Sequence, residues 1–285
     1  MYLTPRRSPA TIVLLAAAAF ALLASLVSQA GSAAPPTSAS GPAKADNYPP
    51  TPVYIYPTNA AKMFRWGAEA WKDEFEVNPL RSDWAVSDGG DVVTRNGMLT
   101  LMAYPNSGTV TATPTTQKAK TGRWETRMRV WEKKRNVGTA YRAYWELVPV
   151  KARKYHCGAQ SIVMASYSQD ELVAAGAVRT LPDQEFSYSV PLPLTQGWFH
   201  TFAVEVAEDH ISWFVDRVVV HTERRPEALA GVRFKPQFRL EAVDGESMRP
   251  TWMQMDWVRY YTMKRPGILP IEAPEMTQGT YAEAC

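Results

Sequence analysis

Short stretches of alternating apolar and polar residues dominate the chain between residues 66 and 263. Residues 123–131 read RWETRMRVW, which sets Trp124, Met128 and Val130 on one side and arginines on the other. Successive side chains of a β-strand point to opposite faces, so this alternation predicts half-buried strands. Similar patterns predict strands at 98–104, 141–148, 159–167, 185–190, 199–206, 210–215, 218–222, 234–242 and 253–262.

Turn-forming residues separate these segments, among them Asn96–Gly97, Thr121–Gly122 and Asp216–Arg217. Helical periodicity is weak, with modest candidates at 60–72 and 225–229. Many short strands joined by tight turns are typical of an antiparallel sandwich. The sequence therefore predicts an all-β fold.

The N-terminal segment differs from the body. Two arginines at positions 6 and 7 precede a charge-free apolar run of 16 residues, 12–27, and small residues follow that run. This order predicts a secretory signal peptide over 1–34. An uncleaved membrane anchor is the alternative, although about 20 apolar residues are needed to span a bilayer. Residues 35–65, which contain seven prolines between 35 and 57, are predicted to form an extended linker.

The charge balance and the motif content exclude several classes of protein. The formal net charge is +3, and it falls to +1 without Arg6 and Arg7, which argues against a nucleic-acid partner. The chain lacks the HExxH, GxSxG, P-loop and GxGxxG motifs, so neither a nucleotide nor another cofactor or metal is expected.

The two cysteines, Cys157 and Cys285, do not have the spacing of a zinc site. Export would permit a disulfide between them, which would attach the C-terminal tail (264–285) to the body. Free or intermolecular thiols are the alternative.

Seven segments of the body have a distinctive order. They read WKDEF…WAV at 71–86, GMLTL at 97–101, GRWETR at 122–127, YRAYWEL at 141–147, FHTFAVE at 199–205, HISWFVD at 210–216 and MDWVRYY at 255–261. In this order they resemble the strands of glycoside hydrolase family 16 and the related concanavalin A-like proteins. The resemblance implies a two-sheet antiparallel jelly roll over 66–263, with a polysaccharide cleft across the concave sheet.

The family's retaining hydrolysis depends on an E-x-D-x-(x)-E strand, which presents a nucleophile and an acid/base to one face. The resemblance assigns this role to residues 157–167, a stretch without any Asp or Glu. Gln160 is expected at the nucleophile position, Ile162 at the helper position, and Ala165 or Met164 at the acid/base position. None of these side chains can do that chemistry.

Other carboxylates are weaker candidates for catalysis. Glu146 follows Trp145, and Asp170 and Glu171 lie in the next predicted turn, where solvated turn charges are the alternative. The strand residues Glu125, Glu205 and Glu241 are expected to pair with Arg127, Arg239 or another neighbour.

The resemblance also points to sugar-binding side chains, because aromatic faces stack on sugar rings and polar groups bond to hydroxyls. The candidates are Tyr141, Arg142, Tyr144, Trp145, Gln160, Trp198 and His200. The alternative is that about half of these rings belong to the core, since the alternation of a strand must turn some of them inward. Basic clusters at 133–135 and 151–154 are predicted to lie near the cleft, where they could receive an anionic cell-wall glycan.

Three functions fit these observations. The first is an exported protein that binds an envelope or extracellular polysaccharide without hydrolysing it. The second is an active hydrolase or transglycosylase on a β-glucan-type polysaccharide with relocated carboxylates. The third is a structural or adhesion domain without a sugar ligand, whose groove is filled by the C-terminal tail.

Overall fold

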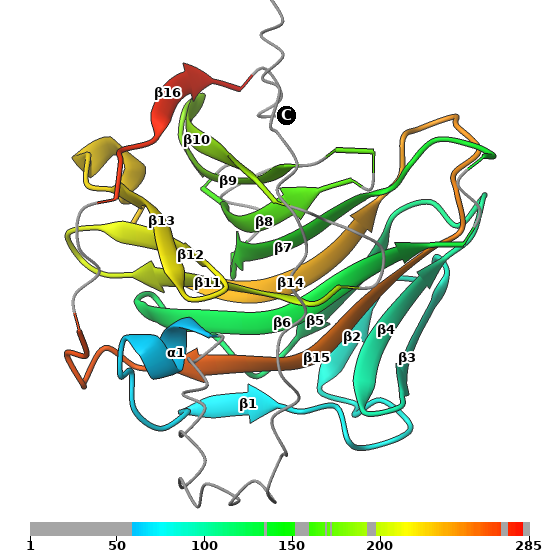
Figure 1. Cartoon of the computed structure of the whole chain (residues 1–285), viewed down its shortest axis with the longest axis horizontal. Helices are drawn as coiled ribbons and strands as arrows, with labels where there is room; N and C mark the ends of the chain where they lie inside the picture. The colour runs from blue at the N-terminus through cyan, green and yellow to red at the C-terminus, as the bar shows by residue number, and fades with distance from the viewer. Residues whose placement is uncertain are drawn as a thin grey trace, which may run out of the picture. The chain divides into compact units, whose positions relative to one another are not determined.

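The alternating segments form two antiparallel sheets that pack face to face (Figure 1). The computed structural model describes residues 59–133, 136–151, 160–168, 170–171, 173–192, 198–268 and 273–281. The predicted signal peptide, the linker up to residue 58, Cys157 and Cys285 lie outside these ranges, as do residues 134–135 and 152–154 of the two basic clusters. The all-β sandwich predicted from the sequence is confirmed.

The first sheet has the spatial order β13 (Val218–Glu223), β12 (Ile211–Val215), β11 (His200–Val206), β6 (Gly122–Glu132), β15 (Thr251–Tyr261), β4 (Met98–Ala103) and β3 (Asp91–Arg95), with β1 (Trp71–Asp73) also paired to β15. The second has the order β16 (Thr277–Thr280), β10 (Gln184–Pro191), β9 (Val173–Thr180), β8 (Ile162–Tyr167), β7 (Arg142–Pro149), β14 (Phe234–Glu241), β5 (Val110–Pro114) and β2 (Trp84–Val86). Two short helices, α1 (Ala60–Met63) and the 3-10 helix η2 (Pro226–Ala228), complete the described elements.

The core lies between the sheets and follows the alternation of the strands. On β6, Trp124, Met128 and Val130 are buried between the sheets, as the pattern predicted. On β14, Phe238 and Leu240 point inward, and the polar residues between the apolar ones point outward. Inside the described ranges, no helix is long and apolar enough to cross a bilayer.

A β-bulge interrupts the alternation of β8. The register with β7 shifts between Trp145 and Glu146, so that Trp145 pairs with Ala165 and Glu146 pairs with Val163. The extra residue, Met164, and its neighbour Ala165 are both buried in the core. Because a bulge adds one residue to a strand, it changes which residues beyond it face outward.

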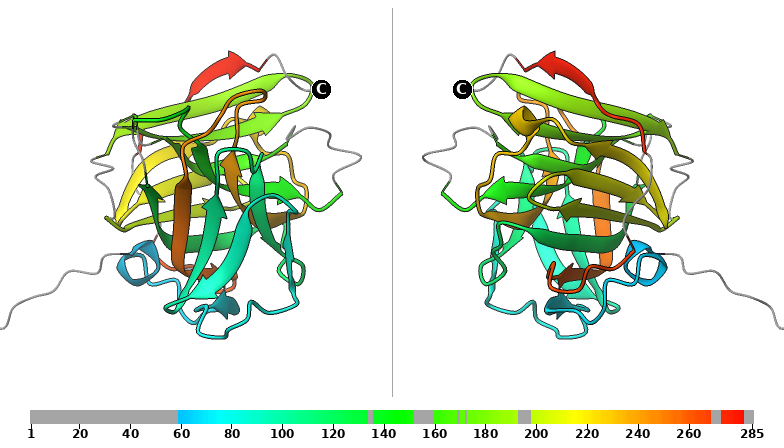
Figure 2. Two further views of the ribbon diagram at one scale, coloured as in Figure 1. Left: turned by 90° about the vertical axis from the view of Figure 1, so that its right-hand side faces the viewer. Right: turned by 90° about the vertical axis from the view of Figure 1, so that its left-hand side faces the viewer.

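The folded body extends beyond the predicted boundaries at both ends. Residues 59–65, predicted to belong to the linker, contain α1, whose Ala60 and Ala61 are buried against Phe214 and Tyr261 of the first sheet. In the tail, residues 277–280 form β16, which extends the second sheet beside β10 (Figure 2). The tail also contacts the first sheet, where Thr222 donates to the Pro274 carbonyl at 3.2 Å.

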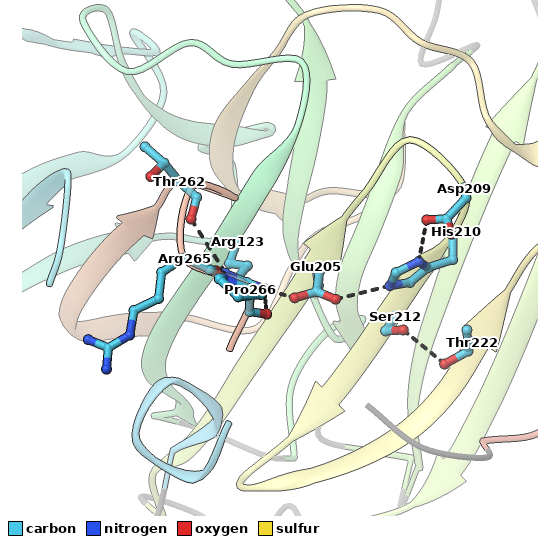
Figure 3. Close-up of polar contacts among 9 residues, drawn as sticks. All are labelled: Arg123, Glu205, Asp209, His210, Ser212, Thr222, Thr262, Arg265 and Pro266. Carbon is cyan, nitrogen blue, oxygen red and sulfur yellow. Dashed lines mark hydrogen bonds and ion pairs between the residues drawn. The ribbon is translucent and has the colours of Figure 1, made fainter. Parts of the chain in front are cut away.

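A buried ionic network holds the chain that follows β15 against the first sheet (Figure 3). Arg123 and Glu205 form an ion pair, and each side chain is 1% exposed. Arg123 also donates to the carbonyl oxygens of Arg265 and Pro266, each at 2.8 Å. These contacts fix the path of residues 262–268 across the outer face of the sheet.

His210 completes this network on the other side of Glu205. Its Nε2 lies 3.0 Å from Glu205 Oε1, and its Nδ1 lies 2.7 Å from Asp209 Oδ1. The hydrogen bond with Glu205 is the main reason why the pKa of His210 is raised. Burial by itself favours the neutral form of Glu205, but bonds from His210 and Arg123 outweigh burial and lower the pKa of Glu205.

A second buried carboxyl, Glu125, joins α1 to the sheet. Its Oε1 accepts from the backbone N–H groups of Ala60 at 2.6 Å and Ala61 at 3.2 Å. Within the described part of the chain, its Oε2 has no hydrogen-bond partner. Burial raises the pKa of Glu125 to about 7, so ionisation of this group opposes folding.

Replacing Glu125 with glutamine is expected to remove a pH dependence of stability. The folded-state pKa is raised from 4.5 to about 7, so the contribution of Glu125 is fully present below pH 4.5 and is lost as the pH rises through 7. By the usual conversion of pKa into free energy, the loss is about 3 kcal/mol. Glutamine keeps an oxygen for the two amides, so Glu125→Gln should be more stable than the wild type above pH 7.

Urea unfolding between pH 4.5 and 8 measures this effect, with the exposed Glu76→Gln as control. A difference in stability between the variant and the wild type that stays constant from pH 4.5 to 8 would contradict the prediction.

Candidate functional site

The outer face of the second sheet carries an open hollow of about 520 Å³. Outward side chains of β7, β8, β9 and β10 line it, because each of these strands turns every other residue away from the core. The lining includes Arg142, Tyr144, Val163, Ser166, Ala175, Ala177, Arg179, Glu185, Ser187, Ser189 and Thr277.

Strand register arranges these residues in rows across the sheet. One row runs from Ser187 on β10 through Ala177, Val163 and Glu146 to Gln237 on β14. The next row runs from Ser189 through Ala175, Ser166 and Tyr144 to Arg239. The small side chains of β8 and β9 form the floor, and larger polar side chains stand on either side of it.

Arg239 is the centre of the charged side of this face. Its Nε donates to Glu146 Oε1 at 2.7 Å, its Nη2 to Glu146 Oε2 at 3.3 Å, and its Nη1 to Glu241. Its guanidinium also lies 3.9 Å from the ring centre of Tyr144. Burial disfavours the charge, but the two glutamates outweigh burial and raise the pKa of Arg239. Burial is also the main reason why the pKa of Tyr144 is raised.

Two further arginines reach into the hollow. Arg142 donates to Ser166 Oγ at 3.1 Å and forms an ion pair with Glu171. Arg179 donates through Nε to Glu185 Oε2 at 2.6 Å. Each arginine keeps N–H groups beyond these bonds, because a guanidinium has five donors. The hollow is therefore rich in fixed donors and acceptors whose charges largely cancel.

The structure brings together three candidates from the sequence, Arg142, Tyr144 and Glu146, on the outward side of β7. The placement of two others in the cleft is wrong. Trp145 is 0% exposed and belongs to the core, and Tyr141 is 1% exposed with its hydroxyl bonded to the Tyr104 carbonyl at 2.7 Å. Tyr141, just before β7, and Trp145, within it, alternate with the outward residues Arg142, Tyr144 and Glu146. Their side chains therefore point into the core.

The expected catalytic positions on β8 are also corrected. Ile162 and Ala165 are 1% exposed and face the core, and Gln160 lies before β8 with a positive φ of 65°. The outward residues of β8 in the hollow are Val163 and Ser166. The expected set 162 and 165 has the same spacing as the outward set 163 and 166, so the alignment to the family strand was one residue out of frame, and in a strand that places every residue on the opposite face. The outward residues on β8 are nevertheless neutral.

The remaining candidates lie elsewhere. His200 begins β11 of the first sheet, where its Nδ1 lies 3.1 Å from Asp216 Oδ2, and Trp198 just before it is 63% exposed. Asp170 pairs with Arg249 at 2.7 Å. Lys133, expected near the cleft, contacts Trp252 on the first sheet instead.

Of the three strand glutamates that were expected to pair with an arginine or another neighbour, two form ion pairs with arginines. Glu241 binds Arg239 as predicted, and Glu205 binds Arg123. Glu125 instead accepts backbone amides of α1, a contact that the linker assignment concealed. Within the described ranges, no group of three His, Cys, Asp or Glu side chains is arranged to hold a metal ion.

Several polar residues of the hollow were missed. Arg179 lies on β9, a strand absent from the sequence prediction because its centre reads AAGA, and Ala and Gly have low strand propensity. Arg239 and Gln237 could have been found, since FKPQFRLE at 234–241 alternates strictly and sets all its polar residues on one face.

No family model matches this sequence, and no curated protein matches it. Solved structures do match. The laminarinase from Rhodothermus marinus is 18% identical with a TM-score of 0.55, and the match covers 68% of this chain and 96% of that one. The endo-β-1,3-glucanase from Pyrococcus furiosus is 17% identical with a TM-score of 0.57, over 68% and 94% of the two chains. A non-specific endo-β-1,3(4)-glucanase of family GH16 is 14% identical with a TM-score of 0.57, over 70% and 91%. The fold of this chain is thus like that of the GH16 glucanases.

Proposed function

We propose that this chain is an exported protein that binds an envelope or extracellular polysaccharide in the hollow of the second sheet and does not hydrolyse it. The observation that carries the proposal is the polar lining of the hollow, in which Arg142 and Arg179 are fixed by carboxylates, as is Arg239 beside Tyr144 on the same face. Sugar hydroxyls both donate and accept hydrogen bonds, so such a surface suits them.

Lack of hydrolysis is inferred from the outward residues of β8 and from the carboxyl groups around Arg239 on the same face of the sheet. Retaining hydrolysis needs two carboxyl groups roughly 5–5.5 Å apart, one acting as nucleophile and the other as proton donor. The outward residues of β8 are Val163 and Ser166, which can take neither role. Glu146 and Glu241 both accept from Arg239, so neither is placed as a free acid.

The polysaccharide class follows from the charge balance. The arginines that line the hollow are paired with glutamates, so their charges largely cancel. An uncharged polysaccharide is therefore neither repelled nor strongly attracted by charge at this surface. A structural neighbour, an endo-β-1,3(4)-glucanase, was crystallised with 1,3-β-D-cellotriosyl-glucose, which makes β-glucan oligosaccharides the first ligands to test.

The Arg142→Gln variant is expected to bind laminarin oligosaccharides at least about tenfold more weakly than the wild type, because hydrogen bonds from charged groups are worth about 1.5–3 kcal/mol. Calorimetric titration measures this loss, and the exposed Arg233→Gln serves as the matched control. Chromatography of the same mixtures should detect no new reducing ends.

Two outcomes would overturn the proposal. Reducing ends that disappear in Glu146→Gln would establish a hydrolase with relocated carboxylates. Absence of binding across a panel of neutral and acidic glycans would instead favour a structural or adhesion domain.

A further inference from the structure

The outer face of the first sheet carries a line of alternating cations and aromatic rings. In order, the line runs Arg127, Phe199, Arg129, Trp131, Lys133, Trp252 and Arg95, and we call these seven residues the cation ladder. Each consecutive pair is a cation–π contact, with distances to the ring centre of 4.2, 4.5, 6.0, 4.2, 3.5 and 5.7 Å.

Strand register builds the ladder from distant parts of the sequence. Arg127, Arg129 and Trp131 are alternate outward residues of β6, and Trp252 of β15 lies opposite Trp131. Arg129 donates through Nε to Gln254 of β15 at 2.9 Å, which fixes the guanidinium beside the rings. Arg95 comes from β3, beyond β4, so the ladder crosses most of the sheet.

The ladder gathers positive charge at the surface. Its exposed members include Arg95, Lys133 and Trp131, and Trp131 is 37% exposed. Asp256 pairs with Arg127 at 2.7 Å. Among the described residues, neither Arg95 nor Lys133 forms an ion pair with a carboxylate, so the line carries an excess of positive charge at these two exposed positions. Burial and the nearby charge of Arg127 together lower the pKa of Arg129, a sign that the cations repel one another.

The rings and the cations are interleaved. Each ring of the ladder has two cations within 6.0 Å of its centre, so the rings help to hold the cations in a line. A guanidinium that stacks on a ring keeps its N–H groups in its own plane, ready for bidentate bonds to carboxylate or sulfate. This arrangement suits anions spaced along a chain, because the cations recur along the line and each can bind a carboxylate or sulfate group.

We propose that the cation ladder is a second carbohydrate-binding site, on the opposite side of the sandwich from the hollow, and that its ligand is a linear polysaccharide bearing carboxylate or sulfate groups. Charge complementarity selects the anion, and the linear order of the cations selects a polymer over a single ion. A bilayer is less well matched, because Phe199 and Trp252 are half-buried and lie between cations. The site does not depend on the function proposed for the hollow.

The test compares binding to dextran sulfate and polygalacturonate with binding to unmodified dextran as the uncharged control. The wild type should bind both polyanions, more weakly as salt increases, since salt screens exposed charges. The Arg95→Gln/Lys133→Gln variant should lose at least tenfold in affinity. The Lys118→Gln/Arg233→Gln variant removes the same charge from exposed positions elsewhere and should keep full affinity.

A third variant separates the ladder from simple net charge. Trp131→Ala leaves every cation in place but removes the ring between Arg129 and Lys133, and it should also weaken polyanion binding. Thermal unfolding of each variant establishes that the fold is kept. Arg142→Gln, in the hollow, should bind the polyanions like the wild type, so failure of one site is distinguishable from failure of the other.

The proposal is overturned if the two double variants lose affinity equally, or if Trp131→Ala binds like the wild type. It is also overturned if the wild type binds phosphatidylserine-containing vesicles through the ladder residues but neither polyanion, because the face would then be a membrane surface.

Discussion

The Arg123→Met variant is expected to unfold about 3–5 kcal/mol more easily than the wild type, because it leaves the buried Glu205 carboxylate without its main cation. The variant also loses the bonds from Arg123 to the carbonyl oxygens of Arg265 and Pro266. For a body of this size the melting temperature should fall by about 10 °C. Urea unfolding measures the free energy and calorimetry the midpoint.

His210 makes this effect depend on pH. Its pKa is raised above the ordinary 6.5, so its stabilising charge is fully present below pH 6.5 and is lost as the pH rises through the folded-state value. Protonated His210 partly compensates Glu205 when Arg123 is absent, so the variant should lose more stability at pH 8 than at pH 6. The double variant Arg123→Met/Glu205→Leu should recover most of the loss, since an apolar pair can replace a buried ion pair. Arg123→Met as stable as the wild type at pH 8 would contradict this account.

Trp145→Ala should also cost about 3–5 kcal/mol, the usual cost of removing a buried large aromatic side chain. Trp145 is 0% exposed and stacks on Phe238, with ring centres 6.2 Å apart. Its neighbour Tyr144, on the outward side of β7, is the matched comparison, and Tyr144→Ala should cost clearly less. Denaturant unfolding separates the two variants.

Glycan titration adds a second comparison for this pair. The folded fraction of Trp145→Ala should keep its affinity, whereas Tyr144→Ala should lose affinity because Tyr144 lines the hollow and supports Arg239. If Trp145→Ala instead lost glycan binding and kept its stability, Trp145 would be a sugar-binding residue, as the family resemblance had implied.

The strands that the sequence predicted well are those with a strict alternation. The pattern of β6 assigned both faces of the strand correctly, and its outward arginines are part of the cation ladder. β9 was missed because small residues carry little hydrophobic signal. The short strands β1 and β2 have three residues each, too few for any period to be visible.

The site was harder to predict than the fold, because it depends on which of the two alternating sets of residues in each strand faces outward. An alignment one residue out of frame placed Ile162 and Ala165 in the cleft, whereas Val163 and Ser166 are the residues that face outward, and no charged residue on β8 marks the correct frame. Pairings across strands, such as Arg179 with Glu185, require the register, which the sequence alone does not give. Charges spread along separate strands, such as those of the ladder, become a site only after β3, β6 and β15 are set side by side.

The position of β15 has a consequence for the synthesis of the protein. β15 lies at the centre of the first sheet, between β6 and β4, yet it comes from residues 251–261, late in the chain. The pairing of Met128 with Met255 spans more than a hundred residues. A nascent chain therefore cannot complete this sheet until residues 251–261 have left the ribosome, and the edges of β4 and β6 that pair with β15 stay unpaired until then. Such a chain folds late and slowly, and it needs protection from aggregation while it grows.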